Sequence, residues 1–140
     1  MRLAFLRSTQ SQDGDVMTAL PTIKAVVPFL PCSDLLAARI YYREALGFSG
    51  LDWIWGEPPM AAGVSRDGVW LFLSQDPDLA ARMTGFRFYI DVENLESLYE
   101  QHQVASVKIV HPLEEKPWGT TEYTVEDIHG YHLHFRRAPE

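Results

Sequence analysis

The chain has 140 residues, 46% of them hydrophobic and 22% charged, which is enough to bury the core of one domain. Its net charge of −7 argues against a nucleic-acid partner, because binding phosphates requires a basic surface. No apolar run approaches the ~20 residues that a membrane span needs, and the apolar stretch at the N-terminus is too short for a signal peptide. We therefore expect one cytoplasmic domain with neither a membrane nor a nucleic-acid partner.

The N-terminal residues are predicted to precede the folded part of the chain. Residues 8–15 (STQSQDGD) are polar and show no apolar periodicity, so residues 1–21 are interpreted as a flexible extension. Met17 is a second possible start, and the sequence leaves this open. Residues 22–137 form the predicted domain.

The first half of this domain contains one helix and four strand-like segments. Residues 23–30 are β-rich, but Pro28 cannot donate to a ladder and so indicates an edge or a crossing point. Either Ser33 or Asp34 caps a helix that ends at Gly47. Strands are predicted at residues 48–55, 60–65 and 69–73, and the Asp67-Gly68 turn joins the last two into a hairpin.

The second half repeats this order after a linker at residues 74–83. A strand at 86–92 and a helix at 95–103 precede strands at 106–110, 121–126 and 131–135. Leu35 lies 60 residues before Leu95, and Gly68 lies 62 residues before Gly130. This nearly constant offset predicts an α+β fold of two βαβββ modules, about 22–74 and 85–137, whose sheets enclose a cleft.

Short motifs along residues 23–136 carry a family resemblance. They are Leu46-Gly47-Phe48, Pro117-Trp118-Gly119 and the stretch from Asp127 to Phe135, in that order. With this order and spacing the chain resembles bleomycin-resistance proteins of the glyoxalase, or vicinal oxygen chelate, superfamily, which also contains dioxygenases. The resemblance implies the glyoxalase/bleomycin-resistance fold, a small-molecule ligand, and a homodimer in which the first strand crosses to the partner near Pro28.

The same resemblance allows a test for the metal site of the superfamily's enzymes. It places one metal-ligand position at His134, and the 62-residue offset carries this position to Phe72. The first-strand positions fall near Val27 and Arg87. A catalytic metal needs about three protein ligands, and only His134 among these four residues can bind a divalent ion. The usual metal site is therefore predicted to be absent.

Two other chemistries were considered from the residues alone. His132 and His134 share one strand face, and Glu122 lies on the adjoining strand, so a relocated site for one divalent metal is an alternative. Nucleophilic catalysis lacks a motif, because GxSxG does not occur and Cys32, the only cysteine, is expected to be a buried and inert thiol.

Aromatic residues dominate the predicted ligand site. Flat rings suit flat ligands and also attract cations. By resemblance, Asp52, Trp53 and Trp118 match drug-binding positions, although Trp118 is equally consistent with a ring packed beneath a loop. Strand alternation points either Tyr89 or Phe88 inward. The predicted ligand-binding residues are Asp52, Trp53, Tyr89, Trp118, Glu122 and His134.

Three functions follow from these observations. The first is a dimer that sequesters a planar or cationic compound, such as an antibiotic, without catalysis or cofactor. The second is a metal-dependent enzyme of the same superfamily: a lyase, isomerase, dioxygenase or thiol transferase. The third is an accessory module whose cleft is incidental. The proline-rich residues 57–60 depart from the familiar drug-binder pattern, which argues against bleomycin itself as the ligand.

Overall fold

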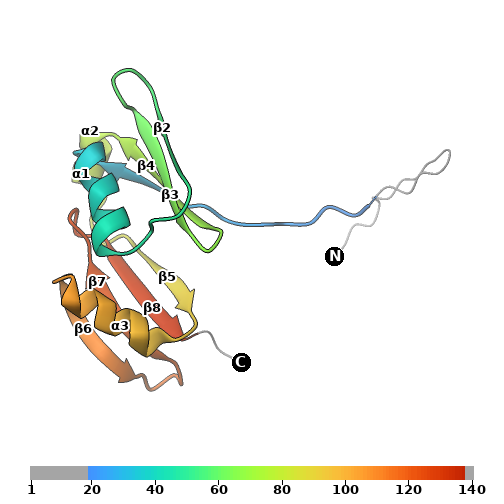
Figure 1. Cartoon of the computed structure of the whole chain (residues 1–140), viewed down its shortest axis with the longest axis vertical. Coiled ribbons are helices and arrows are strands. Elements are labelled where there is room, and N and C mark those ends of the chain that lie inside the picture. Colours follow the sequence, from blue (N-terminus) through green and yellow to red (C-terminus); the bar gives the residue numbers. More distant parts are fainter. Residues whose placement is uncertain (1–18, 138–140) are drawn as a thin grey trace.

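The computed structural model describes residues 19–137 and contains the βαβββ order twice (Figure 1). The first module consists of β1 (Phe29–Cys32), α1 (Leu35–Ile40), η2 (Tyr41–Ala45), β2 (Asp52–Trp55), β3 (Ala61–Arg66) and β4 (Val69–Gln75). The helix α2 (Pro77–Arg82) links it to the second module, which consists of β5 (Arg87–Val92), α3 (Leu95–Val104), β6 (Ile109–Glu115), β7 (Thr121–Glu126) and β8 (His132–Arg137). None of these helices is long and apolar enough to cross a bilayer.

Each module contributes a separate four-stranded mixed sheet. The strand orders are β1-β4-β3-β2 and β5-β8-β7-β6, with one parallel pair in each sheet. Phe29 lies opposite Phe72 in the first parallel pair, and Tyr89 lies opposite His134 in the second. These pairs are related by the same offsets of 60 and 62 residues that the sequence predicts, so the internal repeat is confirmed in three dimensions.

Local chemistry sets the limits of the first helix and the first hairpin. Asp34, rather than Ser33, caps α1, because its carboxylate accepts a 3.1 Å hydrogen bond from the Ala37 amide. The helix continues as a π-helical turn in η2, and Gly47 ends it with a φ of 92°. Asp67 and Gly68 have φ values of 52° and 81°, which is the backbone of a type I′ hairpin turn.

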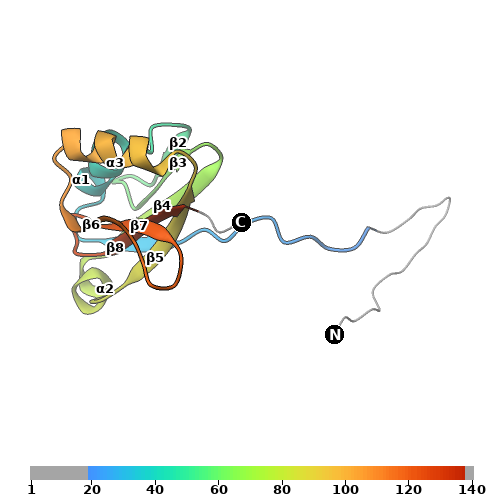
Figure 2. The ribbon, with the colours of Figure 1, turned by 90° about the horizontal axis from the view of Figure 1, so that it is seen from below.

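The core lies between the helices and one face of each sheet. Helices α1 and α3 lie on the same side of the two sheets (Figure 2). The residues that fill this space alternate along the strands with residues on the opposite face. They include Leu30, Leu71, Leu73, Ala62 and Val64 in the first module, and Tyr123, Val125, Leu133 and Phe135 in the second. The opposite faces remain open, apart from α2, which packs beside β1 at the sheet edge.

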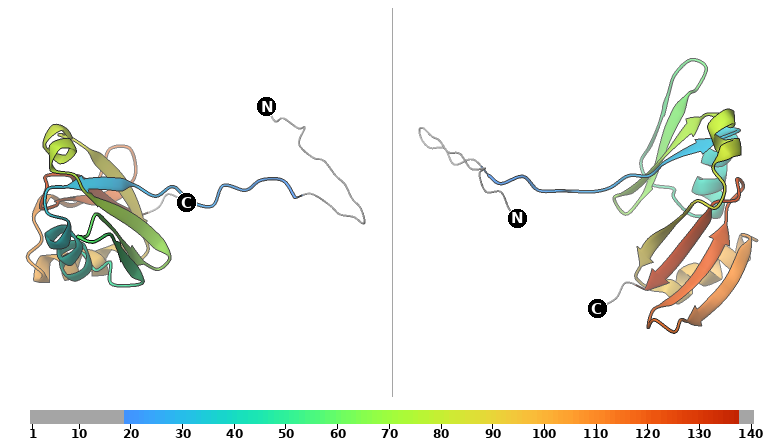
Figure 3. Two further views of the ribbon diagram at one scale, coloured as in Figure 1. Left: turned by 90° about the horizontal axis from the view of Figure 1, so that it is seen from above. Right: turned by 180° about the vertical axis from the view of Figure 1, so that it is seen from behind.

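The first strand is shorter than the sequence predicts. Pairing with β4 covers only Phe29–Cys32, whereas residues 19–28 run outward as an extended arm (Figures 1 and 3). Ile23 and Val26 on this arm are 91% and 89% exposed. The prediction of a strand over residues 23–30 was therefore wrong for its first part within this single chain, because the arm finds no strand to pair with. The predicted extension at residues 1–21 falls mostly outside the described residues.

Hydrogen bonds between buried groups join the two modules. Tyr42 Oη donates to Asp127 Oδ2 at 2.5 Å, and Tyr131 Oη donates to the Pro31 carbonyl at 2.8 Å. His102 Nε2 lies 3.0 Å from the Leu46 carbonyl. These three contacts each link residues more than 50 positions apart, and they fix how the two sheets stand relative to each other.

Candidate ligand-binding surfaces

The open face of the first sheet is aromatic. Trp53 of β2 lies with its ring centroid 5.0 Å from that of Phe72, and Trp70 and Phe29 contact the same phenyl ring edge-on at 6.2 and 6.1 Å. All four residues alternate with the core positions of their strands, which places them on the open side. This surface, the aromatic face, is suited to stacking against a flat molecule.

Gly63 on β3 explains how Trp53 is held. A Cβ atom at Gly63 would lie 2.2 Å from Trp53 Nε1, so the indole lies directly on the glycine backbone. Trp53 and Gly63 are cross-strand neighbours in the β2–β3 pair. The absence of a side chain at residue 63 therefore makes room for the ring, and the indole is fixed over the sheet.

The open face of the second sheet is polar and carries both signs of charge. Its residues come from alternate positions of β5, β7 and β8, and they are Arg87, Tyr89, Asp91, Glu122, Thr124, Glu126, His132, His134 and Arg136. We call this surface the polar face. Glu122, Thr124 and His134 are buried although no helix covers them. Their side chains are shielded by neighbours on the same face, so the polar face has a preorganised centre.

His134 stands at this centre. Its Nδ1 lies 2.9 Å from Thr124 Oγ1, and its ring stacks on Tyr89 with centroids 4.8 Å apart. Burial lowers the pKa of His134, and the nearby Arg87 acts in the same direction against an opposing effect of Glu122. His134 is therefore neutral at pH 7. Its Nε2 atom is buried and has no hydrogen-bond partner among the described residues, which leaves it available to a ligand.

Glu122 and Trp118 form a second polar contact beside His134. The Glu122 carboxylate accepts hydrogen bonds from Thr120 Oγ1 at 2.7 Å and from Trp118 Nε1 at 3.3 Å. Trp118 is 65% exposed, so its ring is not packed beneath a loop. The hydrogen bond from its indole orients an exposed aromatic surface at the border of the polar face.

Asp52 is separated from the other predicted site residues. It faces the helix side of the first sheet, where it forms ion pairs with Arg39 of α1 and with Arg43 of η2. Trp53, the next residue, points to the open face, because successive side chains of a strand alternate. Tyr89 also lies on its open face, whereas Phe88 packs against the core. Five of the six predicted residues therefore lie on or beside the two open faces.

The structure identifies further residues that the sequence analysis did not select. Arg136 lies over the Tyr89 ring at 5.2 Å and donates to Asp91 at 2.5 Å, and Phe29 and Phe72 complete the aromatic face. Phe29 and Tyr89 are the cross-strand neighbours of Phe72 and His134, two positions beyond Val27 and Arg87. The repeat offset, combined with strand alternation, was the signal that pointed to them.

No metal centre is formed by the described residues. Within residues 19–137 no three His, Cys, Asp or Glu side chains are grouped so that they could hold a metal ion. His132 turns away from His134, with its Nε2 3.1 Å from Glu126, and their rings lie 6.5 Å apart. Cys32 is buried, and burial raises the pKa of its thiol to about 12, so it is uncharged and unreactive at neutral pH.

The two open faces meet at the seam between the modules. A hollow of about 260 Å³ lies there, lined by Trp70 from the aromatic face, Tyr89 from the polar face, and Val26 and Pro28 from the arm. The arm therefore starts next to both surfaces.

Comparison with known proteins agrees with this architecture. The bleomycin-binding protein from bleomycin-producing Streptomyces verticillus, complexed with copper(II)-bleomycin, matches with a TM-score of 0.70 and 22% identity over 86% of this chain and 100% of that chain. A bleomycin resistance determinant encoded on the transposon Tn5 matches with a TM-score of 0.69 and 21% identity, over 84% and 100% of the two chains. TioX from Micromonospora sp. ML1 matches with a TM-score of 0.65 and 21% identity, over 81% and 98%.

The sequence itself gives the family. None of the curated proteins matches this chain. The model of the Glyoxalase/Bleomycin resistance protein/Dioxygenase superfamily, however, matches residues 22–135, which include both modules and the start of the arm. The chain therefore belongs to the Glyoxalase/Bleomycin resistance protein/Dioxygenase superfamily.

Proposed function

We propose that this protein is a homodimer that binds and sequesters a planar or cationic small molecule without catalysis. The observation that carries the proposal is the pair of open faces, one aromatic and one polar, that no helix of the same chain covers. The aromatic face offers stacking, and the net charge of −7 favours a cation. Solved bleomycin-binding proteins share the fold, which supports a ligand of the natural-product class.

The arm supports the dimer. Its exposed apolar residues lie on an extended segment without a pairing partner, and β5 is an edge strand of the second sheet. Unpaired strand edges bind extended segments through main-chain hydrogen bonds. In our proposal residues 22–27 of each subunit pair with an edge strand of the other, and this exchange places the aromatic face of one subunit against the polar face of its partner.

Calorimetric titration with metal-free and copper-bound bleomycin tests this function in its narrow form. We expect heat of binding that saturates at one bleomycin per subunit and is lost in both Trp53→Ala and His134→Ala. The absence of heat for either form at high protein concentration would exclude bleomycin as the ligand, and other flat cationic natural products would then be titrated in the same way.

Mixed dimers test whether the ligand site is shared between subunits. In a dimer of one Trp53→Ala and one His134→Ala subunit, a shared arrangement leaves one site with both residues intact. Co-refolding the two variants should therefore restore binding at half the wild-type stoichiometry. A site that lies within one subunit would remain defective in every mixed dimer, and that result contradicts the proposed arrangement.

A second candidate is a metal-dependent enzyme of the superfamily, and one observation favours it. His134 is neutral and its Nε2 is buried without a partner, which is the state of an imidazole that can bind a metal. Elemental analysis after dialysis separates the two candidates. One equivalent of zinc, nickel, iron or manganese per subunit favours the enzyme, whereas metal-free protein that gains no thermal stability from these ions favours the binder.

A further inference from the structure

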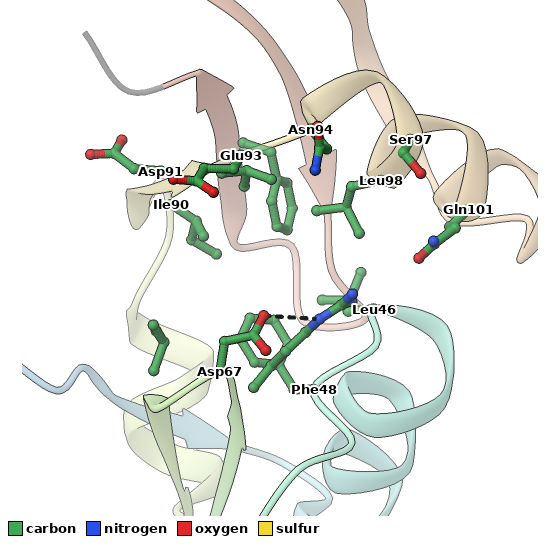
Figure 4. A pocket seen from close by; sticks show the side chains of 14 residues that line it. Leu46, Phe48, Asp67, Ile90, Asp91, Glu93, Asn94, Ser97, Leu98 and Gln101 are labelled. Carbon is green, nitrogen blue, oxygen red and sulfur yellow. Dashed lines mark ion pairs between the residues drawn. The ribbon is translucent and has the colours of Figure 1, made fainter. Parts of the chain in front are cut away.

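A cavity lies on the helix side of the molecule, away from the open faces. It occupies about 550 Å³ between the two modules (Figure 4). One wall comes from the end of η2 and the β3–β4 turn, and the other comes from α3 and the loop that precedes it. Its volume is within the range of about 300–1,000 Å³ that is typical of small-molecule sites.

The interior of this cavity is apolar. Leu46, Phe48 and Phe135 are buried in its lining, and Leu98 of α3 and Ile90 of β5 extend the same surface. These residues come from both modules, so a molecule in the cavity would contact both. Aliphatic and aromatic walls of this kind favour a ligand with a ring or a branched apolar body.

Carboxamide groups supply the hydrogen bonds. Asn94 and Gln101 point toward the cavity from α3 and its start (Figure 4). Asn94 is the N-cap residue of α3 with a φ of 58°, yet its side chain makes no capping hydrogen bond. Asparagine is a favoured N-cap because its side-chain oxygen binds the first helical amides. At Asn94 that donor and acceptor pair is directed to the cavity instead.

The charges around the cavity compensate each other. Arg66 and Asp67 form an ion pair with Nε and Oδ2 3.6 Å apart, directly below the apolar walls. Asp91 and Glu93 stand at the edge of the cavity, and Asp91 is paired with Arg136. A charged ligand would lose its hydration here without gaining an uncompensated opposite charge.

From this arrangement we propose a second binding site, independent of the open faces, for an uncharged molecule that combines an apolar ring with a carboxamide group. The ring lies among Leu46, Phe48 and Leu98. The amide group of the ligand exchanges hydrogen bonds with Asn94 and Gln101, since an amide carries both a donor and an acceptor.

Three probes of similar shape and different charge test this site: benzamide, benzoate and benzylamine. Side-chain NMR signals of Leu46, Leu98, Asn94 and Gln101 report on the cavity. We expect saturable shifts with benzamide at millimolar concentration, and binding of the two charged analogues that is weaker by about fivefold or more, the effect of one uncompensated interaction. Equal shifts with all three probes, or no shifts, would overturn the proposal.

Substitutions locate the binding. Leu98→Trp fills the cavity and should abolish the benzamide shifts, whereas Leu36→Trp on the outer face of α1 is the matched control and should leave them unchanged. Asn94→Ala, at an exposed position that does not depend on refilling the core, should weaken benzamide binding about fivefold. Full binding in both Leu98→Trp and Asn94→Ala contradicts the site. Trp53→Ala should bind benzamide normally, so this test and that of the proposed function fail independently.

Discussion

Tyr42 donates a 2.5 Å hydrogen bond to Asp127 across the junction of the two modules, while its neighbour Tyr41 buries a hydroxyl group with no partner among the described residues. Both tyrosines lie in η2, and both rings pack in the core. Asp127 also accepts from the amides of His129 and Tyr131, so one carboxylate holds the turn before β8 and the first module together.

This difference predicts opposite effects for two adjacent substitutions. Tyr42→Phe removes a donor from a buried carboxylate and should lower the free energy of unfolding by about 1.5–3 kcal/mol. Tyr41→Phe removes an unpaired buried hydroxyl and should leave stability unchanged or slightly higher. Urea denaturation measures both. An equal loss in the two variants would show that the hydroxyl of Tyr42 contributes no more than its packing.

Stability should fall with acid because of His102. This residue is buried, lies 2.8 Å from Tyr123 Oη through Nδ1, and has a pKa that burial lowers. The folded state therefore prefers neutral imidazole, and this contribution is complete above the unfolded pKa of about 6.5 and is lost as the pH falls below it. His134 acts in the same direction.

We expect urea midpoints at pH 7.5 to exceed those at pH 5.5. In His102→Gln the protein should be less stable at pH 7.5, but the difference between the two pH values should shrink. A pH dependence that is unchanged by His102→Gln would assign the effect to other groups.

Gly63 and Trp53 should show strong energetic coupling. Gly63→Ala places a methyl group in the space of the indole and should cost about 1–3 kcal/mol of stability. In the Trp53→Ala background the same change should be neutral or slightly stabilising, because the obstacle is gone and alanine restricts the unfolded chain. A double-mutant cycle in urea measures the coupling. Additive effects would mean that the ring moves aside freely.

The arm should control assembly without affecting the fold of the subunit. Ile23→Asp combined with Val26→Asp changes two exposed apolar residues and should shift the protein from dimer to monomer in light scattering. Circular dichroism should remain unchanged. Leu51→Asp, at a residue that is 77% exposed in the loop before β2, is the control and should remain dimeric. Dimers that persist in the double variant would place the interface elsewhere.

Local patterns in the sequence carried much of the fold. The offset between the halves, the Asp34 cap and the Asp67-Gly68 turn each depend on residues close together in the chain, and the structure agrees with all three. The aromatic supply of the site was likewise visible. Predicted strand ends differ from the observed ones at several elements, since strand pairing decides where a strand stops.

What the sequence determined by itself was the repeated βαβββ order and the residues available to a ligand, because helical and strand periods and turn chemistry are local properties. Tertiary structure alone decided that Asp52 faces Arg39 while Trp53 faces outward, that Glu122 and His134 are buried together, and that residues 19–28 pair with nothing in their own chain. These outcomes depend on sheet register and on contacts between distant segments, such as Tyr42 with Asp127. Periodicity does not encode such contacts.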